Sequence, residues 1–365
     1  MNNVRIIAFY LPQFHPIKEN DEWWGKGFTE WTNVAKAKKL YPKHKQPKIP
    51  ADLGFYDLRI PDVRQQQVEL ARRCGVEGFC YWHYYFGNKK QLLNEIIESV
   101  YEDKQNTFPY CFGWANESWE KKLWNKDGRG NKVLIEQKYG NEDEYTEHFY
   151  EILKYLKDER YITIDGKPLF LIYKPEKLPN ANCLFSCWNK LAKENGLKGI
   201  YFIAHSNWQY KNKEDYLAQG YDGVYSNEVL NGGAFIQRNP FATIRNIFNK
   251  LLGFPKLINF KTLIKESISK YDYQENIFPG ILCGWDHTPR SGRKGLVVTN
   301  FSKKLFKDHI LQVFSTLKNK TPDHRIVFLK SWNEWGEGNF MEPDFEFGSM
   351  KIDTLKEAID EYRKL

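Results

Sequence analysis

Short apolar runs of strand length alternate with segments of helical period along most of the 365-residue chain. Eight runs have the length of a buried strand, at 6–11, 78–84, 109–114, 169–173, 199–204, 223–225, 280–285 and 326–332. Helices are expected between them at 61–74, 90–104, 142–158, 182–195, 212–219 and 302–318, and after the last run at 352–363. This is the element count of a (β/α)8 TIM barrel, so we predict an α/β fold with one catalytic barrel domain, 1–365.

Residues 228–276 interrupt this repeat, because they are too many for an ordinary connection between the sixth and seventh strands. From 238 to 270 the insertion carries seven Lys or Arg residues and one acid, Glu266. Its apolar residues recur at helical spacing: Ile244, Ile247, Phe248, Leu251 and Leu252. One interpretation is a lid that packs its apolar face on the barrel. The other is a helix that contacts an anionic membrane surface through 240–270.

The bulk composition narrows the class of protein. With 41% hydrophobic and 27% charged residues, the chain is expected to fold around a large core. The net charge of +8 is modest, and no zinc-finger spacing or RNP-type motif occurs, so nucleic acid is not an expected partner.

Three observations bear on the compartment. The six cysteines form no CxxC pair, and no apolar run reaches the ~18 residues that span a bilayer. The first apolar run is too short for a signal-peptide core. We expect a cytoplasmic protein, with peripheral contact at the inner membrane as the second reading of the basic insertion.

Polar and aromatic residues gather directly after the apolar runs, where a barrel builds its active site. Aromatic residues make up 16% of the chain, and flat rings that line a cleft suit the apolar faces of sugars. We predict these substrate-binding residues: Tyr10, Glu30, Trp31, Trp82, His83, Trp114, Asn116, Glu117, Trp285, Asp286, His287, Trp332, Asn333 and Trp335. For Glu30 and Glu117 structural salt bridges are an equal alternative, and a single His such as His83 is more often a satisfied residue at a strand end.

The segment SWNEWGEG, 331–338, places Glu334 and Glu337 three positions apart after the last apolar run. Cleaving a glycosidic bond needs a proton for the leaving oxygen and a base or nucleophile, and two carboxyl groups roughly 5 to 9.5 Å apart supply both. The two would point to opposite faces of a straight strand, so the segment must turn, with Gly336 and Gly338 giving the freedom. Repulsion and burial should raise one pKa.

These residues predict Glu334 and Glu337 as catalytic. The alternative is that one Glu caps a helix or pairs with a Lys while the other is solvated. No His, Cys and Asp spacing resembles a metal site, and no Gly-x-Ser-x-Gly motif occurs, so no metal and no cofactor is expected.

Six segments together resemble a known family: DLGFYDLR, GFTEWTNV, FPYCFGWANESW, GKPLFLIYKP, WDHTPR and WNEWGEG. They are similar to the WbsX-type glycosyltransferase family, whose members resemble the glycoside hydrolase family 99 endo-α-mannosidases. The resemblance implies a (β/α) barrel and a setting in bacterial surface polysaccharide synthesis, such as O-antigen or capsule.

The resemblance also implies roles for the two glutamates. By it, Glu334 is the base that acts on the sugar's 2-hydroxyl, which attacks its own anomeric carbon, and Glu337 is the general acid. The mannosidases have a His where this chain has Gly336, which puts mannan specificity in doubt. The chain also lacks the Asp-x-Asp motif of many metal-dependent sugar-nucleotide transferases.

Two hypotheses of function follow. In the first, the chain is a glycosyltransferase, a retaining endo-glycosidase or a transglycosylase that acts on an oligosaccharide or lipid-linked glycan through the Glu pair. In the second, it is a non-catalytic glycan-binding barrel in a membrane-associated polysaccharide assembly complex.

Overall fold

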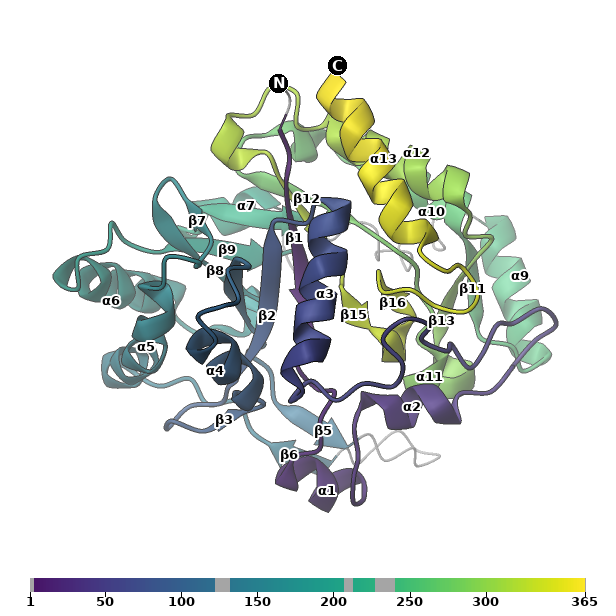
Figure 1. The fold of residues 1–365 in the computed structure, drawn as a ribbon, viewed down its shortest axis with the longest axis horizontal. Helices are drawn as coiled ribbons and strands as arrows, with labels where there is room; N and C mark the ends of the chain where they lie inside the picture. Colours follow the sequence, from purple (N-terminus) through teal and green to yellow (C-terminus); the bar gives the residue numbers. More distant parts are fainter. Residues whose placement is uncertain (1–2, 122–131, 207–212, 227–239, 365) are drawn as a thin grey trace. The chain divides into compact units, whose positions relative to one another are not determined.

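The computed structural model describes residues 3–121, 132–206, 213–226 and 240–364, and within them the predicted TIM barrel is confirmed (Figure 1). The strands follow one another in the order β1 (Arg5–Tyr10), β14 (Ile326–Leu329), β12 (Ile277–Ile281), β10 (Gly223–Ser226), β9 (Tyr201–His205), β8 (Lys167–Ile172), β4 (Tyr110–Trp114) and β2 (Gly78–Tyr85). β1 also pairs with β2, so the sheet closes. Each of the eight predicted runs corresponds to one of these strands.

The chain divides into two compact units. The first comprises Met1–His15, Thr29–Phe79 and Tyr225–Leu365, and the second comprises Pro16–Phe28 and Cys80–Val224.

In the first unit, β1 and β12 both pair in parallel with β14. The side chains of these strands are almost all buried, as expected for parallel strands covered on both faces. Apart from the helices of the insertion, the described α-helices of this unit are α2 (Glu30–Lys36), α3 (Pro61–Cys74), α11 (Thr288–Ser291), α12 (Lys303–Ser315) and α13 (Met350–Lys364). α13 packs against both α3 and α12 (Figure 1).

The bounds of α3 agree with the prediction because its end signals are local. Pro61 stands at the first helical position, where no backbone N–H is needed. Gly75 ends the helix with a left-handed φ of +82°, and a Cβ there would lie 2.8 Å from Ile359 Cδ1 of α13. Glycine is therefore required both for the turn and for the close approach of the two helices.

In the second unit, β8 pairs in parallel with β4 and β9. Its helices are α1 (Lys18–Trp24), α4 (Glu95–Glu102), α5 (Glu142–Leu156), α6 (Ala181–Glu194) and α7 (Lys213–Ala218). α5 packs against α6, and the side chains of Asn141 and Asn180 accept backbone N–H bonds at the starts of these two helices. Short strands complete the unit: β3 (Gln91–Leu92), β5 (Trp119–Lys121), β6 (Lys132–Ile135) and β7 (Thr163–Ile164).

The insertion between β10 and β12 contains α9 (Pro240–Leu251), β11 (Lys256–Asn259) and α10 (Phe260–Lys265). Its first residues, 228–239, lie outside the described part of the chain. β11 pairs in parallel with β13 (Leu296–Thr299), and α10 buries Phe260, Leu263 and Ile264. The second half of the insertion is therefore packed on the first unit.

All six cysteines lie in the described residues, and none is in a disulfide. Five are buried, and Cys183 on α6 is partly exposed. Burial raises the pKa of Cys74 to about 12 and that of Cys283 to about 11. None of the helices in the described ranges has the length and apolar character needed to cross a bilayer.

Candidate active site

The SWNEWGEG segment folds into a tight turn beyond the end of β14. β15 (Asn333–Glu334) and β16 (Asn339–Phe340) pair in antiparallel fashion, and a 3-10 helix at Trp335–Glu337 joins them. Gly338 closes the turn with a left-handed φ of +59°. The turn that the three-residue spacing requires is thus present, and it carries both glutamates on one short loop.

A single arginine holds the two glutamates together. Arg290, from α11, donates from Nη2 to Glu334 Oε1 at 2.5 Å and from Nη1 to Glu337 Oε1 at 2.6 Å. It also donates from Nε to Glu30 Oε2 at 3.2 Å. The structure therefore gathers three predicted site carboxylates, from α2 and the β15–β16 turn, around one guanidinium.

Arg290 was not among the predicted site residues, although it stands in the WDHTPR segment. Nothing in the local sequence shows that its side chain turns back to residues 260 and 44 positions away. A cation at the site could have been expected from the several carboxylates in the post-strand loops, because buried carboxylates require a cation or a proton.

The two glutamates have opposite electrostatic environments. Burial raises the pKa of Glu334, and the nearby charges of Glu337 and Glu30 add to this effect against the attraction of Arg290. Burial alone would also raise the pKa of Glu337, but Arg290 and then His287 lower it below its ordinary value. His287 Nε2 lies 3.5 Å from Glu337 Oε1. Glu334 is therefore the more readily protonated of the pair, as one raised pKa was expected.

Gly336 provides the space for this arrangement. A Cβ built on it would overlap Glu30 Oε2 and would lie 3.0 Å from Arg290 Nε. Its role here is the absence of a side chain and not a left-handed φ, since among the residues 331–338 only Gly338 has a positive φ. The position at which the resemblance places a His is thus filled by the Glu30–Arg290 pair.

The tryptophans next to the glutamates are part of the core. Trp335 is fully buried, with its ring centroid 3.7 Å from that of Phe340 and 5.4 Å from that of Trp31. Trp332 is also fully buried, 5.4 Å from the ring of Phe79. These two rings pack beneath the surface against other aromatic side chains. A sugar could contact them only if the residues that cover them moved.

A buried carboxylate that the sequence did not single out holds Trp335 in place. Glu342 accepts bonds from Trp335 Nε1 at 2.5 Å, Tyr56 OH at 2.9 Å and Gln67 Nε2 at 2.6 Å. Gln67 in turn accepts a bond from Tyr10 OH at 2.7 Å. Burial raises the pKa of Glu342 to about 7. Tyr10, predicted to bind substrate, is one end of this network.

Asn333 has a positioning role as well. Its side-chain amide donates to Leu11 O at 3.0 Å and its Oδ1 accepts from Leu11 N at 2.8 Å. Both bonds are buried and tie the start of the turn to the end of β1.

Asp286 joins two loops on the other side of the turn. Its Oδ2 accepts bonds from His44 Nε2 at 2.8 Å and Gln46 Nε2 at 2.7 Å, and its Oδ1 accepts from Thr288 Oγ1 at 2.6 Å. Burial opposes the charge, but the bonds from His44, Thr288 and Gln46 outweigh it and lower the pKa of Asp286. Leu40 N donates to His44 Nδ1 at 3.1 Å, so the His44 proton is on Nε2.

β12 ends at Ile281, earlier than the predicted run 280–285, because the chain then bends at Gly284. Gly284 has a φ of +133°, and a Cβ there would lie 2.9 Å from Gly338 O. Asp286 N donates to Glu337 O at 2.6 Å. Trp285 and His287 follow with parallel rings whose centroids are 6.1 Å apart. The bend thus brings the predicted residues 285–287 against the turn that carries Glu334 and Glu337.

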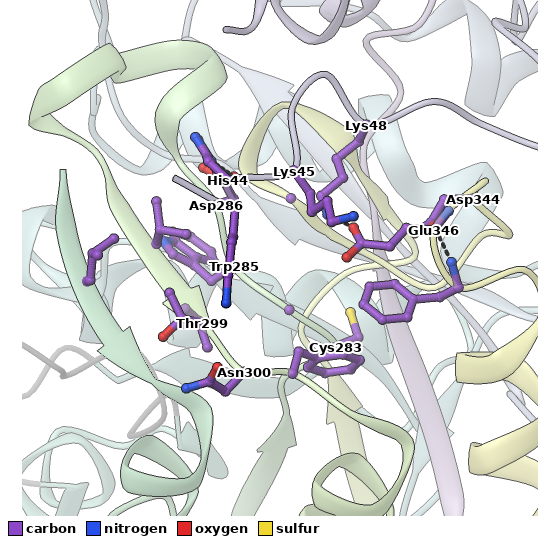
Figure 2. A pocket seen from close by; sticks show the side chains of 18 of the residues that line it. His44, Lys45, Lys48, Cys283, Trp285, Asp286, Thr299, Asn300, Asp344 and Glu346 are labelled. Atoms are coloured by element: carbon purple, nitrogen blue, oxygen red, sulfur yellow. Dashed lines mark hydrogen bonds and ion pairs between the residues drawn. The ribbon is translucent and has the colours of Figure 1, made fainter. Parts of the chain in front are cut away.

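A cavity of about 480 Å³ adjoins this bend (Figure 2). It is formed by the loop 41–48, the bend 283–286, residues 297–301 and the segment after the turn, 338–351. Trp285 and Asp286 line it together with Lys45, Lys48 and Glu346. It therefore combines an aromatic wall with charged groups beside the backbone of the 331–338 turn.

The remaining predicted site residues belong to the second unit. His83 is buried with its Nε2 2.9 Å from His148 Nε2, and burial lowers its pKa to about 3. Trp114 is buried and donates from Nε1 to Tyr85 O at 2.9 Å. These two residues are therefore part of the packed interior.

Of the last three candidates in the second unit, Trp82 and Glu117 are partly exposed and Asn116 is buried. Trp82 is partly exposed with its ring 5.2 Å from that of Tyr173. Asn116 donates to Lys174 O at 2.9 Å, and Glu117 lies 3.9 Å from Lys177 Nζ near the surface. A role for these three in sugar binding stays a prediction.

The comparison with protein families matches residues 6–355 to the model described as Glycosyltransferase WbsX. The chain belongs to the WbsX glycosyltransferase family. Within relatives of known sequence, the WxcX proteins of two Xanthomonas campestris pv. campestris strains are each 34% identical to it over 355 residues. The match covers 97% of this chain and 49% of each relative, so the chain spans about half the length of the curated relatives it matches.

Solved structures show the same fold as this WbsX family member. A glycoside hydrolase-like protein matches with a TM-score of 0.63 at 14% identity, covering 98% of this chain and 94% of its own. The GH99 endo-alpha-mannosidase from Bacteroides thetaiotaomicron matches with a TM-score of 0.56 at 16% identity, covering 100% and 99%. At this identity the likeness concerns the fold alone. The family is described by the name Glycosyltransferase WbsX, and the fold is shared with these two solved structures.

Proposed function

We propose that this chain is a carbohydrate-active enzyme of bacterial surface polysaccharide metabolism, as in O-antigen or capsule. It would cleave or transfer a glycosyl unit with Glu334 and Glu337. The observation that carries the proposal is that one guanidinium, Arg290, binds both carboxylates at 2.5 and 2.6 Å. The two carboxyl groups therefore face the same guanidinium. Their separation must be less than roughly 9.5 Å, the upper end of the range for glycosidase carboxyl pairs.

The pKa directions support a division of labour between the two. A carboxyl group with a raised pKa can deliver a proton, and one with a lowered pKa remains an anion, which is the pairing that glycosidic cleavage requires. In the free enzyme this makes Glu334 the candidate acid and Glu337 the candidate base or nucleophile. The assignment is the reverse of the one that the resemblance implies.

The proposed step can be written with these side chains alone. The Glu334 proton passes to the glycosidic oxygen as its bond to the anomeric carbon breaks, and Glu337 stabilises the positive charge that develops there. The oxygen of a water or of an acceptor sugar hydroxyl then bonds to the anomeric carbon and gives its proton to the Glu334 carboxylate, which restores the pair. Arg290 would hold the two carboxylates in register and would keep both from being protonated together.

The proposed substrate is an oligosaccharide or a lipid-linked glycan at the cytoplasmic face of the inner membrane. A lipid-linked donor fits the setting that the family resemblance implies. It would also explain why the chain needs no Asp-x-Asp motif for a sugar nucleotide. We propose one barrel domain for this activity, with residues 228–276 as an insertion in it.

Glu334→Gln and Glu337→Gln test the proposal. Each should lower turnover of lipid-linked or free oligosaccharides about 10²- to 10⁴-fold while leaving glycan binding nearly unchanged. An aryl glycoside whose leaving group needs no proton should restore activity to Glu334→Gln but not to Glu337→Gln. Rescue of Glu337→Gln instead would give the roles that the resemblance implies, and full activity in both variants would reject catalysis by the pair.

The same substrates separate transfer from cleavage. Reactions are run with and without sugar nucleotides, and new reducing ends are measured. Reducing ends released in the absence of any nucleotide would favour the glycosidase, and product formed only with a nucleotide would favour the transferase.

A second candidate function has one observation in its favour. Arg290 contacts all three carboxylates, so each already has a partner within the protein. This is what a non-catalytic glycan-binding barrel in a polysaccharide assembly complex would show. If cells that carry both Gln substitutions still make normal surface polysaccharide, this second function is the correct one.

A further inference from the structure

Helix α9 presents an uncovered apolar ridge. Its members lie at helical spacing on one face, and their side chains are 51% to 80% exposed: Ile244, Ile247, Phe248, Leu251 and Leu252. The neighbouring α10 behaves differently, because its apolar residues are buried. An exposed apolar ridge on a helix is typical of a surface that binds a protein or a membrane.

The sequence around this ridge lacks acidic residues. Three stretches of the first unit, 31–51, 240–265 and 287–307, contain no Asp or Glu. Together they carry the following cations: Lys36, Lys38, Lys39, Lys43, Lys45, Lys48, Arg245, Lys250, Lys256, Lys261, Lys265, Arg290, Arg293, Lys294, Lys303, Lys304 and Lys307. Arg290 has its role in the site, and Lys48, Lys303 and Lys307 form ion pairs with acids outside these stretches. The other cations together favour an anionic partner.

The three stretches meet at the C-terminal end of the ridge. Arg293 packs on Gly253, directly after Leu252, so closely that a Cβ on this glycine would overlap the guanidinium. The ring of Phe254 lies 6.2 Å from that of Tyr41. β11 and β13 join the second and third stretches by parallel pairing.

The side chains at this junction are open to solvent. Lys43 and Lys45 follow Tyr41 in the loop 41–48, and Lys294 follows Arg293, which contacts Gly253. All four residues are exposed. We define the cationic rim as these four residues. Apolar ridge and cationic rim are therefore neighbours on one surface of the first unit.

We propose that the α9 ridge and the cationic rim dock on an anionic lipid surface. Apolar side chains that enter the headgroup boundary, next to cations that meet lipid phosphates, are the combination that interfacial helices use. Nucleic acid would use the cations but would leave the ridge exposed, and a second copy would place like charges opposite each other. The inference goes beyond the proposed activity and does not depend on it.

Docking has a consequence for the cavity of Figure 2. Lys43 and Lys45 of the rim also line that cavity, as does Leu257 of β11. A docked chain would hold the cavity close to the lipid headgroups, where the glycan of a lipid-linked substrate begins.

Vesicle sedimentation of the 365-residue chain tests the proposal. Vesicles of phosphatidylcholine alone are compared with vesicles of phosphatidylcholine and phosphatidylglycerol at low and high salt. The wild-type chain should sediment with the mixed vesicles, and salt should weaken its binding. Phe248→Ser/Leu251→Ser should weaken binding at least about tenfold, because each residue loses its apolar insertion.

The charge variant Arg293→Glu/Lys294→Glu should weaken binding to the mixed vesicles on the order of tenfold or more and should abolish the salt dependence in large part. Ile60→Ser is the matched control, since Ile60 is an exposed apolar residue at the start of α3 and lies outside ridge and rim. Circular dichroism melts confirm that each variant is folded, which is expected because the changed side chains are exposed.

Several results would overturn the proposal. One is failure of the wild-type chain to bind the mixed vesicles, and another is equal binding by the wild-type chain and the ridge variant. A third is a stable wild-type dimer in light scattering that the ridge variant does not form, since the ridge would then bind a second copy. Binding to duplex DNA or RNA in place of vesicles would also overturn it. None of these measurements uses glycan turnover, so failure here is separate from failure of the enzymatic proposal.

Discussion

Gly336 shows how one missing side chain can set the chemistry of a site. Because it has no Cβ, the carboxylate of Glu30 and the guanidinium of Arg290 can lie against the turn that carries Glu334 and Glu337. A larger residue at this position would push that pair away and free the two glutamates from their shared partner. The Gly336 position is therefore a candidate for what separates this chain from the family 99 mannosidases it resembles.

At the same scale, Glu342 predicts a pH dependence of stability. Its pKa in the folded chain is about 7, against an ordinary value of 4.5. Between these values the folded state binds more protons than the unfolded state, so stability falls as the pH rises from 4.5 to about 7. Glu342→Gln cannot titrate and should not show this loss.

Chemical denaturation of both proteins across this pH range measures the effect. The stability of the wild-type chain relative to Glu342→Gln should fall by up to about 3 kcal/mol. Glu334 shifts in the same direction but is present in both proteins, so the difference isolates Glu342. Parallel pH curves would show that the Glu342 carboxyl group does not keep its proton in the folded chain.

At the scale of elements, Asp286 anchors the loop 37–50 to the bend after β12. The Asp286 pKa is lowered by its bonds to His44, Thr288 and Gln46, so this stabilisation is present above the ordinary pKa of 3.8 and is lost as the pH falls through the lowered value. Asp286→Asn should cost about 1–3 kcal/mol near neutral pH, because it weakens charge-assisted bonds in a buried place.

Urea denaturation at neutral and at acidic pH checks this. The difference between wild type and Asp286→Asn should shrink as the pH falls. Asp57→Asn is the control: Asp57 also has a lowered pKa, from its bonds to Arg59, but that pair is partly exposed and should contribute little. An Asp286→Asn chain as stable as wild type at neutral pH would contradict the anchoring role.

The elements themselves were largely predictable from sequence, and their connections were not. Apolar runs and helical periods are local, so each of the eight predicted runs overlaps a barrel strand and α3 has its predicted bounds, although β12 begins three residues before its predicted run. The predicted strands at 280–285 and 326–332 extend past the C-terminal ends of β12 and β14, because apolar residues continue beyond Ile281 and Leu329. Short helices in the first loops, α1 and α2, have too few residues for a periodic signal.

The candidate site divides in the same way. That Glu334 and Glu337 lie close together could be predicted because three residues span at most about 10 Å even when extended. Arg290, His44 and Glu342 could not, since each acquires its role from partners that are distant in sequence. Conversely, Trp332 and Trp114 carried an aromatic signal that burial explains equally well.

At the scale of the whole molecule, the border between the two units runs through two strands. Gly78 and Phe79 of β2 fall in one unit and its other residues in the next, and β10 is divided in the same way after Val224. A strand is a single element, so a border that divides β2 and β10 argues against two separately folding domains. We therefore predict one cooperative unfolding transition for the proposed single domain.

Tryptophan fluorescence and far-ultraviolet circular dichroism, recorded during urea unfolding, check this prediction. The two probes should give the same midpoint and the same slope. Two separated transitions would mean that the units unfold independently.

The unequal burial of the six cysteines has a practical consequence. Five thiols are sheltered in the packed interior, and for Cys74 and Cys283 a high pKa further suppresses the reactive thiolate. Under native conditions a maleimide dye would therefore attach first at Cys183, on the outer part of α6. Cys183 can therefore serve as a fluorescent labelling site without any engineered residue.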